Sequence, residues 1–116
     1  MKLDMFGPFD FTVESIDNNI TYSKPGDYAL GFQNSSGLFV ICYIGRAEKD
    51  LRTELKCFIG TPRYDKFKFS YSATVKEAYE TQCKIYHDYG GFRTLDNHFH
   101  PMKPSGGPYH CPTCGD

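Results

Sequence analysis

The sequence contains no tryptophan, no long apolar run and no surplus of basic residues. Because a membrane-spanning helix needs about 20 consecutive apolar residues, we expect no membrane segment. The N-terminal residues also lack the continuous apolar stretch of a secretory signal, so we expect a cytoplasmic protein. The formal net charge is −1. This near-neutral charge argues against tight binding of DNA or RNA by the surface as a whole, since phosphate neutralisation drives such binding.

Aromatic side chains are abundant, with ten phenylalanines and nine tyrosines among 116 residues. A chain of this length fits one domain with one core. Tyrosine can lie half-buried with its hydroxyl in water, so the rings suit either a lined cleft or a core built from aromatic side chains.

The expected elements follow from hydrophobic periodicity and from glycine and proline breaks. Residues 28–32, 38–44 and 66–71 have strand patterns, whereas residues 47–58 and the segment from Thr74 to residues 86–87 have helical spacing. Ser72 or Thr74 can cap the second of these helices, and Glu77 completes a capping box with Thr74. This order predicts an α+β fold with a small antiparallel three-stranded sheet flanked by helices. We expect residues 1–24 to be an N-terminal extension with an edge strand near Phe9, residues 25–100 to form the domain, and residues 101–116 to be an irregular tail packed on it.

Five cysteines are present, and two of them form the motif Cys111-x-x-Cys114. An odd number of cysteines without a secretory signal disfavours a disulfide framework, so the close pair predicts metal binding or redox chemistry. Cys83 and His87 are four residues apart on the second predicted helix and therefore share one face. Together the four residues make a Cys₃His set, which is typical of structural zinc. Three histidines compete with this set as ligands, His100 first, then His98 and His110.

The order of motifs resembles the GIY-YIG endonuclease superfamily. Gly26-Asp27-Tyr28 stands at the first triplet of that family, and Tyr43-Ile44-Gly45 matches the second. Three further stretches resemble a group of small bacterial proteins with this fold: residues 86–90 (YHDYG), residues 97–101 (NHFHP) and residues 111–114 (CPTC). The resemblance spans roughly residues 25–114 and implies a GIY-YIG-like fold whose C-terminal tail is held to the domain by zinc.

The resemblance also implies residue roles for phosphodiester cleavage. In such nucleases a tyrosine of the first triplet helps to activate water, a helix arginine steadies the phosphate and a later glutamate holds Mg²⁺ or Mn²⁺. The arginine position reads Glu54 here and the glutamate position reads Gln82. A carboxylate repels phosphate, and an amide is a poorer ligand for a hard cation. The implied catalytic site is therefore degenerate, and it comprises Tyr28, Tyr43, Arg46, Gln82 and Asn97.

Three functions remain open from the sequence. The first is a nucleic-acid-binding domain with weak or lost cleavage, for which the basic residues Arg63, Lys66 and Lys68 are the expected DNA or RNA contacts. The second is an active endonuclease that depends on Mg²⁺ or Mn²⁺. The third is a zinc-stabilised module that binds a protein partner.

Overall fold

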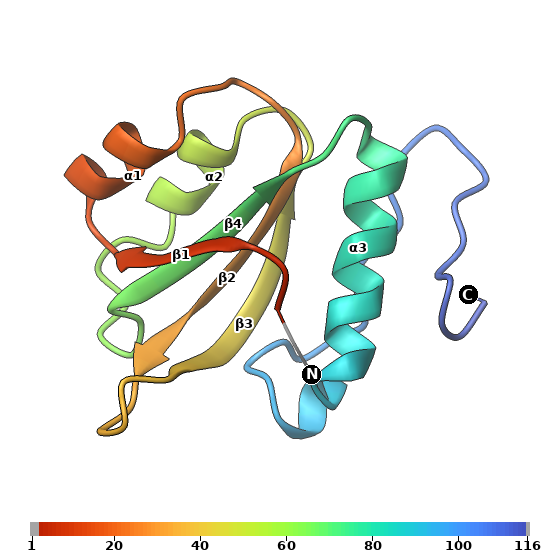
Figure 1. Cartoon of the computed structure of the whole chain (residues 1–116). Coiled ribbons are helices and arrows are strands. Elements are labelled where there is room, and N and C mark those ends of the chain that lie inside the picture. The colour runs from red at the N-terminus through yellow and green to blue at the C-terminus, as the bar shows by residue number, and fades with distance from the viewer. Residues whose placement is uncertain (1–2, 116) are drawn as a thin grey trace.

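The computed structural model describes residues 3–115 and contains a four-stranded antiparallel sheet with the strand order β1-β4-β2-β3 (Figure 1). The prediction of an α+β fold is confirmed, whereas the prediction of three strands is wrong. The elements, in chain order, are β1 (Phe6–Asp10), α1 (Val13–Asn19), β2 (Gly26–Gln33), β3 (Phe39–Ala47), α2 (Leu51–Lys56), β4 (Lys66–Tyr71), α3 (Val75–Asp88) and the short 3₁₀ helix η1 (Gly91–Arg93).

The fourth strand is β1, which lies at the edge of the sheet beside β4. Phe6 pairs with Phe69 and Phe9 with Phe67, and the ring centroids of these pairs lie 5.4 and 5.6 Å apart. Cross-strand aromatic pairs of this kind stabilise a sheet edge. The alternation of apolar residues near Phe9 therefore did indicate a strand, but the strand ends at Asp10. Thr12 then caps the unexpected helix α1 by accepting a hydrogen bond from the backbone N–H of Ser15.

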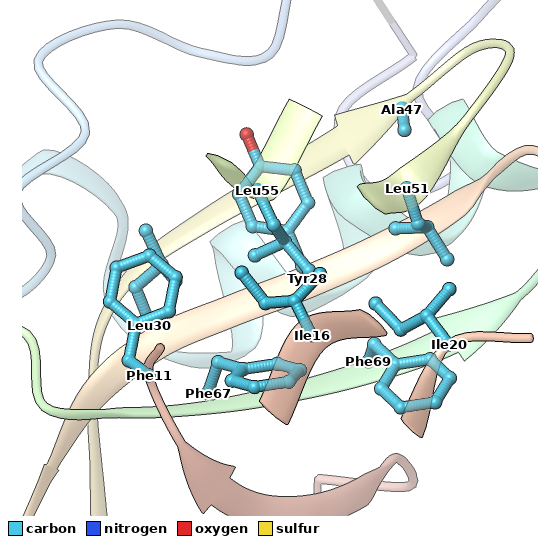
Figure 2. Close-up of a cluster of buried hydrophobic side chains, with 10 residues drawn as sticks. All are labelled: Phe11, Ile16, Ile20, Tyr28, Leu30, Ala47, Leu51, Leu55, Phe67 and Phe69. Carbon is cyan, nitrogen blue, oxygen red and sulfur yellow. The ribbon is translucent and has the colours of Figure 1, made fainter. Parts of the chain in front are cut away.

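The main core lies between the sheet and the helices α1 and α2, which cover the same face (Figures 1 and 2). Alternate residues of β2 and β4 point into it, and Tyr28 pairs with Phe69 while Leu30 pairs with Phe67. In Figure 2 the hydroxyl of Tyr28 points away from the other labelled side chains, toward the rim of the core. The buried members of this core are Phe11, Ile16, Ile20, Tyr28, Leu30, Ala47, Leu51, Leu55, Phe67 and Phe69.

Helix α3 packs on the opposite face of the sheet and contacts β3 and β2 (Figure 1). It begins after Thr74, whose hydroxyl accepts a hydrogen bond from the N–H of Glu77, as the capping pattern predicts. Ile44, Tyr86 and Leu95 form a second small core beneath it. The tail runs back along the other side of α3 (Figure 1). No helix within residues 3–115 is long and apolar enough to cross a membrane.

The junction between β3 and α2 differs from the expected boundaries. The strand continues past Gly45 to Ala47, and the helix covers only Leu51–Lys56 instead of residues 47–58. Gly45 lies opposite Tyr28 in the ladder, and the tyrosine ring covers the position where a β-carbon would stand. Glycine therefore permits close packing within the strand here and does not end it. Asp50 starts α2 by accepting a hydrogen bond from the N–H of Arg52.

Substituting Gly45→Ala is expected to lower the free energy of unfolding by about 1–3 kcal/mol, since the added methyl group overlaps the Cζ and Oη atoms of Tyr28. Urea denaturation measures the effect. In the Tyr28→Ala background the ring is absent, so the same glycine substitution should have little effect. A cost that is equally large in both backgrounds would show that the ring is not the cause.

Candidate functional site

A cleft of about 1140 Å³ lies along β3, which is the outer strand of the sheet on this side. Residues from both faces of an outer strand, and segments that cover its edge, can all reach such a cleft. All five residues of the predicted catalytic site line it, namely Tyr28, Tyr43, Arg46, Gln82 and Asn97. Glu54 lines it as well.

The two tyrosines lie against each other on the α2 side of the cleft. Their ring centroids are 6.4 Å apart, and the hydroxyl of Tyr28 donates a hydrogen bond to Oε2 of Glu54 at 3.3 Å. Burial, and then the negative charge of Glu54, raise the pKa of Tyr28 far above its usual value. The same two causes raise the pKa of Tyr43. Both phenols therefore stay protonated at neutral pH, which makes them poor bases for activating water.

Arg46 lies on the opposite face of β3, and its guanidinium group is bound by other side chains. It donates to Oε1 of Gln82 at 2.9 Å and forms an ion pair with Glu48 at 2.8 Å. It also stacks 5.3 Å above the ring centroid of Tyr79. The side chain is only 11% exposed. Arg46 thus ties α3 to β3, and most of its hydrogen-bonding capacity is already used.

Asn97 covers the edge of β3. Its Nδ2 donates to the carbonyl of Ile44 at 2.7 Å, and its Oδ1 accepts from the N–H of Ile44 at 3.0 Å. The backbone N–H of Asp96 donates to the carbonyl of Cys42 at 2.6 Å. The amide of Asn97 therefore satisfies both backbone hydrogen-bonding groups of Ile44 at the edge of the sheet. It also holds the following residues beside β3, where they form one wall of the cleft.

Carboxylates outnumber cations among the charged side chains that line the cleft. The acidic residues are Glu48, Asp50, Glu54 and Asp96, and the basic residues are Arg46 and Lys49. The cleft therefore does not attract phosphates by its formal charge.

Asp27, the middle residue of the first triplet, lies outside the cleft lining and is completely buried. Within the described part of the chain, neither of its carboxylate oxygens has a hydrogen-bond partner. Burial raises the pKa of Asp27 from its ordinary value of 3.8 to about 8, although the charge of Arg46 and the nearby Ser72 oppose the shift. Sequence reasoning passed over this group, and the available signal was a carboxylate inside an otherwise apolar strand.

A second group of functional side chains joins α3 to the tail. His87, His100, Cys111 and Cys114 each place one nitrogen or sulfur atom within 4.8 Å of those of the others. Among residues 3–115 this is the only group of three or more His, Cys, Asp or Glu side chains arranged closely enough to hold a metal ion. Two nitrogen and two sulfur donors suit a tetrahedral metal such as zinc.

The hydrogen bonds around these four residues fit a bound cation. Nε2 of His87 is buried without a hydrogen-bond partner in residues 3–115. Nδ1 of His100 lies 3.0 Å from the carbonyl of Pro101 and can donate to it, which leaves Nε2, 3.5 Å from the sulfur of Cys114, free as a ligand atom. Burial alone would raise the pKa of Cys111, but the backbone N–H groups of Cys114 and Thr113 and the side chain of His100 lower it to about 6. A thiolate is the form that binds metal.

The group in the structure differs by one residue from the predicted zinc-binding set. Cys83 is not a member of the group, and His100, the first of the three competing histidines, takes its place. Cys83 is fully buried and packs with Tyr79 and Cys111. Burial is the main cause that raises the pKa of Cys83 to about 12, so this sulfur remains a neutral thiol beside the group. His98 and His110 are exposed and lie outside the group.

The expected nucleic-acid contacts do not line the cleft. Arg63 lies beside it, because it forms an ion pair at 3.3 Å with Asp96, which does line it. Lys66 forms an ion pair with Asp10. The ammonium group of Lys68 lies 5.5 Å from the ring centroid of Phe39.

One wall of the cleft consists of residues 98–102, which the sequence analysis considered for their histidines and for the NHFHP motif. Phe99 and Met102 in this wall are 82% and 79% exposed.

Comparison with models of protein families, with curated proteins and with solved structures finds no match for this chain.

Proposed function

We propose that this chain is a zinc-stabilised domain that binds nucleic acid in the cleft along β3 and does not cleave it. The proposal rests on the hydrogen bonds and the ion pair that the candidate catalytic side chains form with neighbouring side chains. Tyr28 binds Glu54, and Arg46 binds Gln82 and Glu48. Nucleic acid is proposed as the ligand because of the resemblance to GIY-YIG nucleases. The contacts of Tyr28 and Arg46 are the reason to propose that phosphodiester cleavage is lost.

Cleavage of a phosphodiester needs an activated oxygen and a cation near the developing negative charge. Burial and Glu54 keep the phenol of Tyr28 protonated, and Gln82 replaces the metal-binding carboxylate. The described residues also offer no cluster of carboxylates in the cleft that can hold a divalent metal. The same cleft retains the half-buried ring of Tyr43 and the exposed ring of Phe99, which suit binding.

The zinc in this proposal is structural. His87, His100, Cys111 and Cys114 would fill a tetrahedral site and leave no open position for water, which is the arrangement of structural zinc. When bound, the ion supplies a cross-link between α3 and the tail. The tail needs such a cross-link, since only Pro101, Pro104 and Cys111 are buried among residues 101–115.

A second function, binding of a protein partner, is favoured by the charge of the cleft. Four carboxylates against two cations, beside the exposed Phe99 and Met102, would suit a basic segment with apolar side chains.

Binding and cleavage assays test the proposal together. We expect labelled DNA or RNA to bind and to remain uncut with Mg²⁺ or Mn²⁺. Tyr43→Ala should weaken binding, whereas Phe92→Ala serves as the matched control, because Phe92 is an exposed ring that does not line the cleft. Absence of any binding would refute the proposal. Cleavage that Tyr28→Phe abolishes would instead establish an active nuclease.

A further inference from the structure

The wall formed by residues 98–102 is anchored at both ends, yet its largest side chains are uncovered. At one end Asn97 is bound to the backbone of Ile44. At the other end His100 belongs to the metal-ligating group, and Pro101 is buried. Between and beside these anchors Phe99 and Met102 project into solvent. Such anchoring holds the backbone of Phe99 at the rim of the cleft and leaves its ring exposed.

The ring of Phe99 has a polar aromatic neighbour. Its centroid lies 6.5 Å from that of His98, with the two planes steeply inclined. Both residues line the cleft that also contains Tyr43. An exposed aromatic ring is a surface on which an unpaired base can stack, and every base has a suitable face.

The accessibility of the bases, and not the charge of the cleft, distinguishes a single strand from a duplex. Carboxylates are in the majority in the cleft, so the phosphates of either ligand contribute little attraction. Stacking on an exposed ring needs an uncovered base face. The faces of bases inside a duplex are covered by their neighbours, whereas those of a single strand are accessible.

We infer that the cleft binds the unpaired bases of single-stranded nucleic acid, with one base stacked on Phe99. This inference rests on the proposed nucleic-acid binding and specifies its ligand. Stacking on one ring contributes about 1–3 kcal/mol per base. The Phe99→Ala substitution should therefore weaken binding by about ten- to a hundred-fold.

The test is a titration with a labelled oligothymidine of roughly ten nucleotides, a length within the range of small single-strand-binding domains. Phe99→Ala should lose affinity by the stated factor, and a duplex of equal length should bind more weakly than the single strand. Phe92→Ala is the matched control, because Phe92 is 65% exposed and does not line the cleft. The chain has no tryptophan, so Phe99→Trp introduces a single tryptophan. This variant should retain binding, and the stacked base should quench its tryptophan fluorescence.

The outcomes separate this inference from the proposed function. If the single strand binds Phe99→Ala as tightly as the unchanged protein, or if the duplex binds better, the inference is overturned and nucleic-acid binding stands. If neither oligonucleotide binds, both are overturned. Binding of a basic peptide without any oligonucleotide would likewise overturn both and support the protein partner.

Discussion

Removing the metal ion, or substituting Cys111→Ser, is expected to release the tail from α3 while the sheet stays folded. The tail buries few side chains of its own, whereas β1–β4 enclose a separate core with α1 and α2. A ligand that binds only the folded state stabilises it by about 4 kcal/mol when its free concentration is 1,000 times its Kd. The expected loss is of this order, and it should be confined to residues 98–115.

Metal analysis and amide hydrogen exchange measure this effect. Purified protein should contain about one zinc per chain, and Cys111→Ser should contain almost none and exchange rapidly in the tail. Cys57→Ser is the control, since Cys57 is an exposed thiol outside the group. Cys83→Ala should retain zinc. Loss of zinc from Cys83→Ala, or its retention by Cys111→Ser, would contradict the ligand set His87, His100, Cys111 and Cys114.

The second large effect is expected from Asp27→Asn, which should stabilise the fold at neutral and alkaline pH. Burial raises the pKa of Asp27 from 3.8 to about 8, so the folded protein binds a proton that the unfolded chain has released. Stability contributed by this carboxyl group is complete below pH 4 and is lost as the pH rises toward 8. Asparagine has no charge to bury, so the variant should gain several kcal/mol, at most about 5, by pH 8.

Urea denaturation between pH 4 and 9 tests this prediction. The difference between Asp27→Asn and the unchanged protein should be small at pH 4 and should grow as the pH rises. Asp4→Asn, which removes an exposed carboxyl group, should give a curve parallel to that of the unchanged protein. A constant difference for Asp27→Asn would show that the carboxyl group does not titrate in the predicted way.

The local parts of this fold were predictable from sequence patterns. Alternation of Phe67, Phe69 and Tyr71 with polar residues predicted β4, and Thr74 with Glu77 predicted the start of α3. These signals are contained within a few residues and do not depend on distant contacts. The resemblance in motif order also led us to expect one shared catalytic site. The five residues of that site line one cleft, namely Tyr28, Tyr43, Arg46, Gln82 and Asn97.

The parts that sequence patterns left open depend on contacts between distant segments. Alternation near Phe9 indicated a strand, but its place in the sheet depends on Phe6 and Phe9 meeting the rings of β4, which lie about 60 residues further on. The sequence left open whether His100 or Cys83 belongs to the metal-ligating group. The structure groups His100 with His87, Cys111 and Cys114, which depends on the path of the tail after Pro101, and no periodicity describes that path. The hydrogen bond from Arg46 to Gln82 likewise required the α3–β3 contact.

The most direct test of the whole account is to map oligothymidine binding by nuclear magnetic resonance on the zinc-loaded protein. We predict that chemical shifts change at Tyr43, His98 and Phe99, with the oligonucleotide remaining intact in Mg²⁺. Changes confined to Arg63, Lys66 and Lys68 would place the ligand on the basic segment outside the cleft and contradict this account.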